Sequence, residues 1–272
     1  MVNRHTFCLL LFAIFAGCVG QYESLLNGSD HDLKYAKAME YYNAKKYTRA
    51  KDLFERIIMI NRGSPRDDTV QYYLGLSLYY SGDFLEAEPT FDRFTQIFPR
   101  SPFTEKARFL RIDCLMDMSF RWELDQMPTH KAISVINEFL YDYPSSTYFN
   151  RCNELLDELR ERLERKSYEA AKIYYKIEDY RAAAFALRNV LRDNPDNRYR
   201  EEIMYYIVAS NYKYAINSVQ YRQRERFITV IDEYYNFISD YPESKYSNEL
   251  NVMFKRAQRA TTKREDISNS PD

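Results

Sequence analysis

LGLSLYYSGDFLEAEPTFDRFTQIFP, residues 74–99, is the stretch of sequence from which the fold of this chain can be predicted. Small and apolar residues recur in it at helical spacing on both sides of Gly82, where a turn is expected. The stretch ends at Pro99, and a helix usually ends before a proline. It therefore predicts two helices joined by a tight turn.

The end of this stretch recurs along the chain. IFPRS at 97–101 is followed by DYPSS at 142–146, DNPDN at 193–197 and DYPES at 240–244, so that successive prolines lie 45, 51 and 47 residues apart. Periods of this size, each closed by a helix-stopping proline, indicate a helical solenoid. The composition agrees, because 6 Gly and 9 Pro among 272 residues suit a helical protein with few tight turns.

Position by position, residues 74–99 resemble the tetratricopeptide repeat. In that family, small residues such as Gly75 and Ala87 let the two antiparallel helices approach, and a side chain such as Phe91 fills the space between them. Units in the same register lie at 38–65 and 171–195, and two more, with longer connections, lie at 104–144 and 201–242. The link of the unit at 104–144 is expected to contain Trp122 and Pro128.

Between the third and fourth units, an apolar stripe at helical spacing predicts one long helix from about 150 to 175. We therefore predict an all-α fold, an α-solenoid of about five tetratricopeptide-like helical hairpins that spans residues 33–258 as one elongated body. Residues 259–272 show no periodic apolar pattern and are expected to form a disordered tail.

The N-terminal residues have the layout of a secretory signal. An apolar run at 7–16 follows a basic start, and it is about half as long as the ~20 residues that cross a bilayer. FAGC at 15–18 resembles the bacterial lipobox, in which the cysteine receives lipid and the leader is cut before it. We expect residues 1–17 to be a lipoprotein signal peptide and Cys18 to carry the lipid, with an ordinary cleaved signal as the alternative.

The residues after Cys18 suggest where the lipidated chain resides. Residue 19 is Val rather than Asp, which in enterobacterial lipoproteins permits transfer to the outer membrane. Several acyl chains hold a protein on a membrane, since each buried methylene adds about 0.8 kcal/mol. Residues 18–32 are mainly polar and are expected to form a flexible leash.

Several kinds of chemistry are not expected. Lys and Arg number 39 and Asp and Glu 40, which leaves no basic excess for binding nucleic acid. His5, His31 and His130 are far apart in sequence, so we expect neither a metal site nor histidine-based catalysis. Without a glycine-rich phosphate loop or a nucleophile elbow, the chain is expected to be no enzyme and to need no cofactor beyond its covalent lipid. Cys114 and Cys152 are expected to be buried thiols, with a disulfide between them as the alternative.

A protein-binding groove is the remaining expectation. In tetratricopeptide solenoids the first helix of each unit lines the concave side, and rigid tyrosines there suit the capture of an extended peptide. The alternative is that some of these side chains, Tyr80 above all, only pack between helices. The candidates from the first two units are Tyr35, Met39, Tyr42, Tyr72, Leu76, Tyr79 and Tyr80.

The whole architecture resembles the BamD family of lipoproteins. The most diagnostic stretches are LRERLERK at 159–166, EAAKIYY at 169–175, DYRAA at 179–183 and LRDNPD at 191–196. The resemblance implies a lipid-anchored protein at the periplasmic face of the outer membrane. It further implies that the first two units bind unfolded outer-membrane proteins and the last units dock on a BamA-type barrel insertase.

The resemblance does not extend to one docking residue of the family. The arginine that supports docking in familiar members aligns with Ala186, with Arg188 two residues further on, so we do not transfer it as a site. One alternative is a periplasmic tetratricopeptide adaptor for envelope or peptidoglycan machinery, although no heptad run precedes Lys34. A carbohydrate-binding lipoprotein of the SusD kind is disfavoured, because those proteins are much longer and carry large inserted loops.

Overall fold

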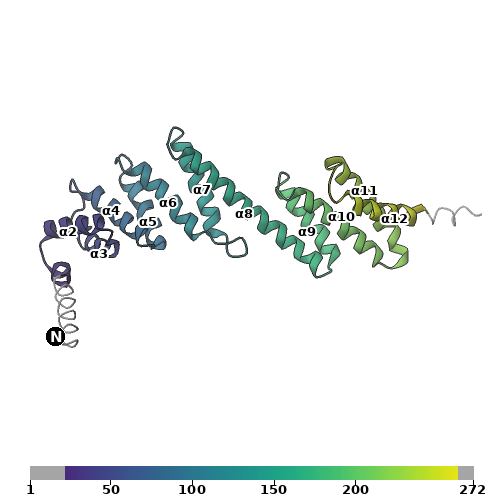
Figure 1. Ribbon diagram of the computed structural model, residues 1–272, viewed down its shortest axis with the longest axis horizontal. Coiled ribbons are helices and arrows are strands. Elements are labelled where there is room, and N and C mark those ends of the chain that lie inside the picture. Colours follow the sequence, from purple (N-terminus) through teal and green to yellow (C-terminus); the bar gives the residue numbers. More distant parts are fainter. Residues whose placement is uncertain (1–21, 263–272) are drawn as a thin grey trace, which may run out of the picture. The chain divides into compact units, whose positions relative to one another are not determined.

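The computed structural model describes residues 22–262, and this part of the chain consists of helices joined by turns and loops (Figure 1). It divides into two compact units. Unit 1 holds the residues up to Phe120 together with Asp125–Leu156, and unit 2 holds Arg121–Leu124 and the residues from Asp157 onward. The helices are α2 (His31–Asn43), α3 (Tyr47–Ile57), α4 (Asp67–Tyr80), α5 (Phe84–Ile97), α6 (Thr104–Met118), α7 (Met127–Asp142), α8 (Phe149–Lys176), α9 (Tyr180–Asp193), α10 (Arg200–Ile216), α11 (Gln220–Asp240) and α12 (Ser247–Thr262).

The predicted all-α, tetratricopeptide-like fold is confirmed. The expected hairpins appear as α2/α3, α4/α5, α6/α7, α8/α9 and α10/α11, and α12 packs on the last of them. The long helix expected at about 150 to 175 is observed as α8, whose first part belongs to unit 1 and whose remainder belongs to unit 2. None of the helices within residues 22–262 is long and apolar enough to cross a lipid bilayer.

The hairpin α4/α5 shows why its small residues are needed. A Cβ atom added at Gly75 would lie 2.7 Å from Cε1 of Phe91, closer than real Cβ contacts allow. Gly82 in the turn has a φ of +81°, a conformation that glycine adopts without steric cost. Phe91 is fully buried beside Gly75, and the hairpin can therefore close only around this pair.

The recurring proline segments do more than stop helices. Two residues after each proline, a Ser or Asn side chain accepts a hydrogen bond from the backbone N–H two positions further on. These bonds run from Phe103 to Ser101 (3.3 Å), from Tyr148 to Ser146 (3.0 Å), from Tyr199 to Asn197 (2.9 Å) and from Tyr246 to Ser244 (3.0 Å).

Each segment is also tied to the preceding first helix. The serine hydroxyls donate to carboxylates, and the aromatic rings stack on rings of that helix, which explains the fixed spacing of proline, Ser or Asn, and aromatic residue. The donor pairs are Ser101 with Asp68 (2.9 Å), Ser146 with Glu105 (2.7 Å) and Ser244 with Glu201 (2.6 Å). The stacked pairs are Tyr72 with Phe103, Phe109 with Tyr148, Tyr168 with Tyr199 and Tyr205 with Tyr246.

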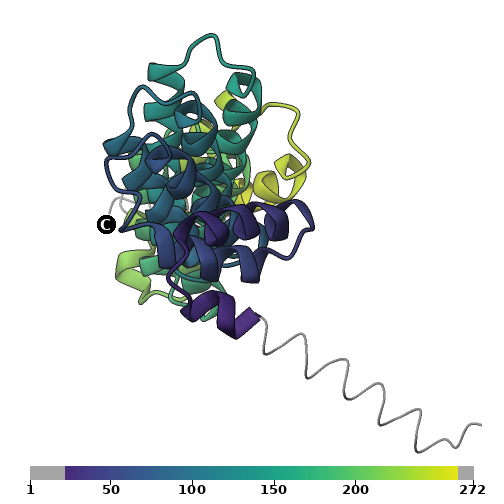
Figure 2. The same cartoon turned by 90° about the vertical axis from the view of Figure 1, so that its left-hand side faces the viewer.

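The described part of the expected leash at 18–32 is corrected by the structure. Residues 22–27 form a short helical segment beside the α2/α3 hairpin (Figure 2). The hydroxyl of Tyr22 donates to Asp52 (2.8 Å), and the guanidinium of Arg49 lies 5.0 Å from the centroid of the Tyr22 ring. The polar composition of this segment concealed an aromatic anchor. Cys18 and the predicted signal peptide lie outside the described residues.

Two boundaries also differ from expectation. Pro128, expected in the link of the third hairpin, lies in the first turn of α7, where the missing N–H of proline has no intrahelical role. The segment Arg121–Leu124 is held by Lys166 of α8, whose ammonium donates to the carbonyl oxygens of Trp122 (3.1 Å) and Leu124 (2.7 Å). Helix α12 continues to Thr262, so the first four residues of the expected tail are helical. The remainder of the tail lies outside the described residues.

Candidate functional site

Two of the seven predicted groove residues lie in the core of unit 1. Tyr72 is 3% exposed and Leu76 is 4% exposed. The ring of Tyr72 stacks on Phe103 at a centroid distance of 4.5 Å and also lies 5.7 Å from Phe94. Helix α4 is apolar on nearly every side and is therefore buried, so these two side chains cannot line an open groove.

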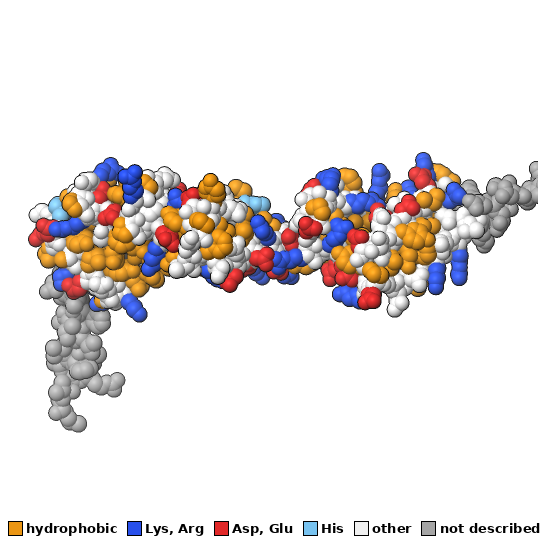
Figure 3. Space-filling view, turned by 90° about the horizontal axis from the view of Figure 1, so that it is seen from above, with side chains coloured by type: hydrophobic (Ala, Val, Ile, Leu, Met, Phe, Trp, Pro, Cys, Tyr) orange, Lys and Arg blue, Asp and Glu red, His pale blue; other side chains and the backbone are white. Residues whose placement is uncertain are grey.

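The other five candidates lie at the edge of the core or outside it. Tyr35, Met39, Tyr42 and Tyr79 are half-buried and pack against the core of unit 1. Tyr80 is 45% exposed, and its ring also packs on Tyr47 of the neighbouring helix α3, so both roles considered for it stay open. On the face shown in Figure 3, hydrophobic side chains gather over the hairpins α2/α3 and α4/α5.

Four tyrosines form one aromatic cluster, which we call the unit 1 cluster: Tyr42, Tyr47, Tyr73 and Tyr80. The rings of Tyr47 and Tyr80 are stacked at 5.0 Å, and Tyr42 meets Tyr47 at 5.6 Å and Tyr73 edge-on at 4.9 Å. Sequence reasoning missed Tyr47 because only first helices were considered, and Tyr47 is the first residue of the second helix α3. Its position directly after the turn Ala44–Lys46 could have signalled it.

An open pocket of about 610 Å³ adjoins this cluster. Three of its lining side chains are cations and none is an acid, and it lies at the N-terminus of α3, where Lys46 provides no side-chain cap. Uncapped N–H groups at a helix start favour anions, and the nearby cations add to this preference. The pocket therefore offers aromatic faces and a positive field together. Its lining residues are Lys45, Lys46, Tyr47, Thr48, Arg49, Tyr80 and Ser81.

Further along unit 1, α6 carries a half-buried carboxyl group, that of Asp113. Asp113 of α6 accepts a hydrogen bond from Tyr79, and Asp117 and Arg151 act on the same carboxyl. Burial, with a smaller contribution from Asp117, raises the pKa of Asp113 to about 6, although Arg151 and the Tyr79 hydroxyl lower it. Burial likewise raises the pKa of Tyr79 to about 12, so its hydroxyl remains a proton donor at neutral pH. The fold of unit 1 therefore favours the protonated form of Asp113.

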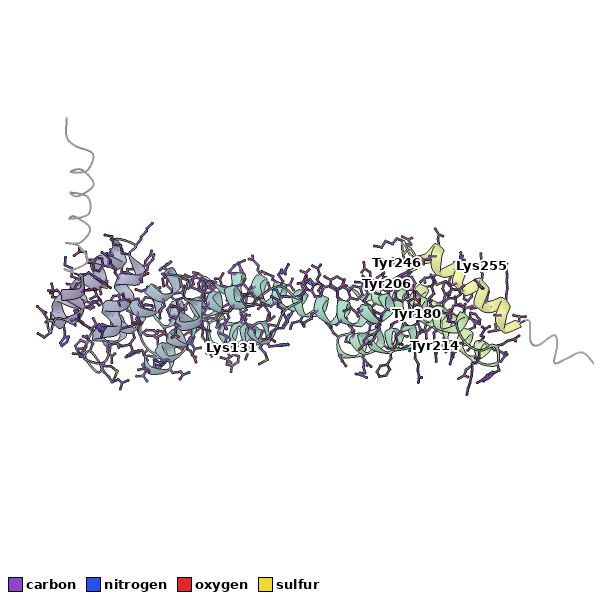
Figure 4. All side chains as sticks on the ribbon, turned by 90° about the horizontal axis from the view of Figure 1, so that it is seen from below. Lys131, Tyr180, Tyr206, Tyr214, Tyr246 and Lys255 are labelled. Carbon is purple, nitrogen blue, oxygen red and sulfur yellow. The ribbon has the colours of Figure 1, made fainter. Side chains whose placement is uncertain are left out.

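Unit 2 carries an aromatic surface that the sequence reasoning did not find. It runs from α8 and the start of α9 over α10 to Tyr246, just before α12, and we call it the unit 2 row. Its rings meet at 5.0 Å (Tyr175 with Tyr206), 5.0 Å (Tyr206 with Tyr205), 4.3 Å (Tyr205 with Tyr246), 5.5 Å (Tyr175 with Tyr180) and 6.5 Å (Tyr206 with Tyr168). Figure 4 shows Tyr206 between Tyr180 and Tyr246. The sequence-based expectation of a groove covers only the first two helical hairpins, α2/α3 and α4/α5, although tyrosines recur on the first helices of later hairpins.

Unit 2 also exposes apolar side chains near the α8/α9 turn. Ile173 and Tyr174 on the last turns of α8, Ile177 in the turn after it and Phe185 on α9 are all at least 41% exposed. Arg188 pairs with Glu233 of α11 at 2.6 Å. The arginine closest to the docking position of the BamD family is therefore engaged within the chain.

Cys114 and Cys152 are free thiols, so the alternative of a disulfide between them is excluded. Both Cys114 and Cys152 are fully buried, and burial raises the pKa of their thiols to about 12 and about 11. Such thiols remain protonated and unreactive at neutral pH. Within residues 22–262, no group of three or more His, Cys, Asp or Glu side chains is arranged to hold a metal ion.

Comparisons with known proteins give a consistent picture. The family model described as YfiO, outer membrane lipoprotein, matches residues 28–220 and 167–265. The outer membrane protein assembly factor BamD of Caulobacter vibrioides is 20% identical over 212 residues, which cover 77% of this chain and 70% of that protein. The BamD of Neisseria meningitidis is 28% identical over 180 residues, which cover 62% of this chain and 67% of that protein.

Two solved structures are also similar to this chain. The TPR2AB domain of yeast Sti1 matches at 12% identity with a TM-score of 0.40, covering 85% of this chain and all of that one. A tetratricopeptide repeat protein from Parabacteroides merdae matches at 12% identity with a TM-score of 0.35, covering 90% of this chain and 81% of that one.

Proposed function

This chain belongs to the YfiO/BamD family of outer-membrane lipoproteins, and from that premise we propose that it is a non-catalytic scaffold of the β-barrel assembly machinery. In this proposal a lipid on Cys18 holds the mature chain at the periplasmic face of the outer membrane. Unit 1 binds unfolded outer-membrane proteins, and unit 2 docks on a BamA-type insertase.

The observation that carries the proposal is the basic pocket beside the unit 1 cluster. A peptide that ends in an aromatic residue presents a ring and a carboxylate next to each other. The ring can stack on Tyr80 and Tyr47, whose planes already lie within 24° of one another. The carboxylate then meets Lys45, Lys46 and the free N–H groups at the start of α3. Barrel proteins typically end in such a residue, which makes them the substrates that fit.

The substrate part of the proposal is tested with a fluorescent peptide that ends in phenylalanine, in two forms. The form with a free carboxylate should bind about fivefold more tightly than the amidated form, as expected for one partly exposed ion pair. Tyr80→Ala should weaken binding by roughly 1 to 2 kcal/mol if the ring is an anchor. Tyr141→Ala is the matched control, because Tyr141 is 87% exposed and contributes to neither the cluster nor the pocket. Equal binding of both peptide forms would place the substrate elsewhere.

The docking part rests on the exposed apolar side chains of unit 2. Ile173, Ile177 and Phe185 give an apolar area suited to a partner surface, and Phe185 is 65% exposed. Phe185→Ser should reduce recovery of a BamA-type insertase after mild crosslinking in membranes while circular dichroism stays unchanged. Val252→Ser, which removes another exposed apolar side chain of unit 2, is the control. Unchanged recovery with Phe185→Ser would remove this area from the interface.

The lipid anchor is tested separately. Cys18→Ser should move the protein from the membrane fraction to the soluble periplasmic fraction, because a chain without acyl groups has no buried methylenes to hold it. Mass spectrometry of the N-terminal peptide should show the acyl groups on the unsubstituted protein. An unmodified Cys18 in the mature protein would contradict this part of the proposal.

A further inference from the structure

The unit 2 row differs from an ordinary packed seam because three of its six tyrosine hydroxyls already donate to carboxylates. Tyr168 donates to Glu202 at 2.8 Å, Tyr246 donates to Glu202 at 3.4 Å, and Tyr205 donates to Glu249 at 2.9 Å. The tyrosines therefore cannot use these protons to bind a ligand. Tyr168 is buried, whereas Tyr205 and Tyr246 are half-buried and present part of their electron-rich ring faces, each with a carboxylate at its edge.

This surface already holds cations that belong to the chain itself. The ammonium of Lys172 lies 4.8 Å from the centroid of the Tyr168 ring and 5.0 Å from that of Tyr206. The ammonium of Lys245 lies 4.9 Å from the Tyr246 ring. Positive groups within about 6 Å of an aromatic face are attracted by the ring quadrupole. The row thus lies beside two cations of the chain itself, Lys172 and Lys245.

One carboxylate in the row is left with an open acceptor. Glu202 uses both oxygens for the two tyrosine hydroxyls, whereas Glu249 uses only Oε1, for Tyr205. Within the part of the chain that the structure describes, neither carboxylate lies within ion-pair distance of a Lys or Arg. Glu249 is exposed at the start of α12, next to the half-buried rings of Tyr205 and Tyr246. An incoming cation could therefore meet Glu249 and a ring face at once.

We propose that the unit 2 row binds an extended segment of a partner protein through an arginine side chain that stacks on Tyr205 or Tyr206 and pairs with Glu249. Arginine fits better than lysine, because its planar guanidinium can lie on a ring and donate to a carboxylate in the same pose. Apolar residues beside the arginine would contact the remaining half-buried rings. The charge preference is opposite to that of the basic pocket in unit 1, so the inference does not depend on what occupies that pocket.

The probe is a fluorescein-labelled nonapeptide in which leucine and arginine alternate between glycine-serine ends, titrated with the full mature protein at 150 mM salt. Glu249→Gln keeps an acceptor for Tyr205 but removes the charge, and it should weaken binding at least about fivefold. Asp232→Asn removes the same charge from the exposed surface of α11 and should leave the affinity unchanged. A peptide with glutamate in place of arginine should not bind.

A second variant separates recognition from a loss of structure. Lys172→Gln removes the competing cation from the half-buried Tyr206 ring and should strengthen binding of the arginine peptide by about two- to threefold, which damage to the fold would not do. The proposal is overturned if the arginine peptide does not bind, if Glu249→Gln and Asp232→Asn have equal effects, or if the glutamate peptide binds as well.

Discussion

The unit 1 cluster and the unit 2 row are both built from tyrosines on tetratricopeptide-like hairpins, yet they offer different chemistry. In unit 1, Tyr80 is largely exposed and its hydroxyl has no hydrogen-bond partner within residues 22–262, while cations line the adjacent pocket. In unit 2, the hydroxyls of Tyr168 and Tyr205 are tied to glutamates. A tetratricopeptide scaffold thus positions the rings, and the charged neighbours determine which ligand each surface can take.

The largest effects are expected from the cores that hold the two surfaces. Phe91→Ala in unit 1 and Phe237→Ala in unit 2 each remove a fully buried ring and should cost about 3 to 5 kcal/mol. In a repeat protein, stability is a sum of local and nearest-neighbour contributions. Amide hydrogen exchange should therefore show lost protection mainly in the unit that carries the change. Equal loss in both units would contradict the description of two separate cores.

The proline segments should contribute similarly in both units. Ser146→Ala in unit 1 and Ser244→Ala in unit 2 each leave a carboxylate without its donor and a backbone N–H without its acceptor. Each should lower the free energy of unfolding by about 1 to 3 kcal/mol in urea titrations. Ser145→Ala changes an exposed neighbour and should have no measurable effect. A loss as large for Ser145→Ala would mean that the hydrogen bonds are not the cause.

A pH effect should be confined to unit 1. Because burial raises the pKa of Asp113 to about 6, the folded state holds this proton more tightly than the unfolded state does. The resulting stabilisation is complete below about pH 4 and is lost as the pH rises through 6. Asp113→Asn should therefore gain about 1 to 2 kcal/mol over the unsubstituted protein at pH 7.5, and no more than a few tenths at pH 4. A gain that is the same at both pH values would exclude ionisation of Asp113 as its source.

The smallest effects compare the hydroxyl groups of the two surfaces. Tyr80→Phe in unit 1 removes a hydroxyl without a partner and should change stability by less than about 0.5 kcal/mol. Tyr205→Phe in unit 2 breaks the bond to Glu249 and should cost about 1 kcal/mol. Thermal unfolding of both variants measures the difference. If Tyr80→Phe were the more harmful of the two, the distinction between free and committed hydroxyls would fail.

Sequence patterns were sufficient where they were local. The helical hairpins and the limits of α8 followed from apolar spacing, from Gly82 and from the recurring prolines. Each of these signals acts within a single helix or hairpin. The core positions of Tyr72 and Leu76 could not be found in this way, because α4 is apolar on nearly every side and does not show which face is open.

Contacts between distant residues were likewise out of reach. Glu249 meets Tyr205 across 44 residues, and Tyr22 meets Asp52 across 30. No spacing rule pairs such residues before the stacking of helices is known. The carboxylates of the unit 2 row and the docked segment 22–27 therefore appeared only in the structure.

The central claim, that unfolded barrel proteins bind at the unit 1 cluster, is tested most directly by photo-crosslinking in the full-length protein. A photoreactive amino acid is placed at position 80, or at position 141 as the control, and an unfolded outer-membrane protein is supplied. We predict crosslinks from position 80 that disappear when the terminal aromatic residue of the substrate is deleted, and none from position 141. Crosslinks from position 141 alone, or equal crosslinks from both positions, would contradict the account.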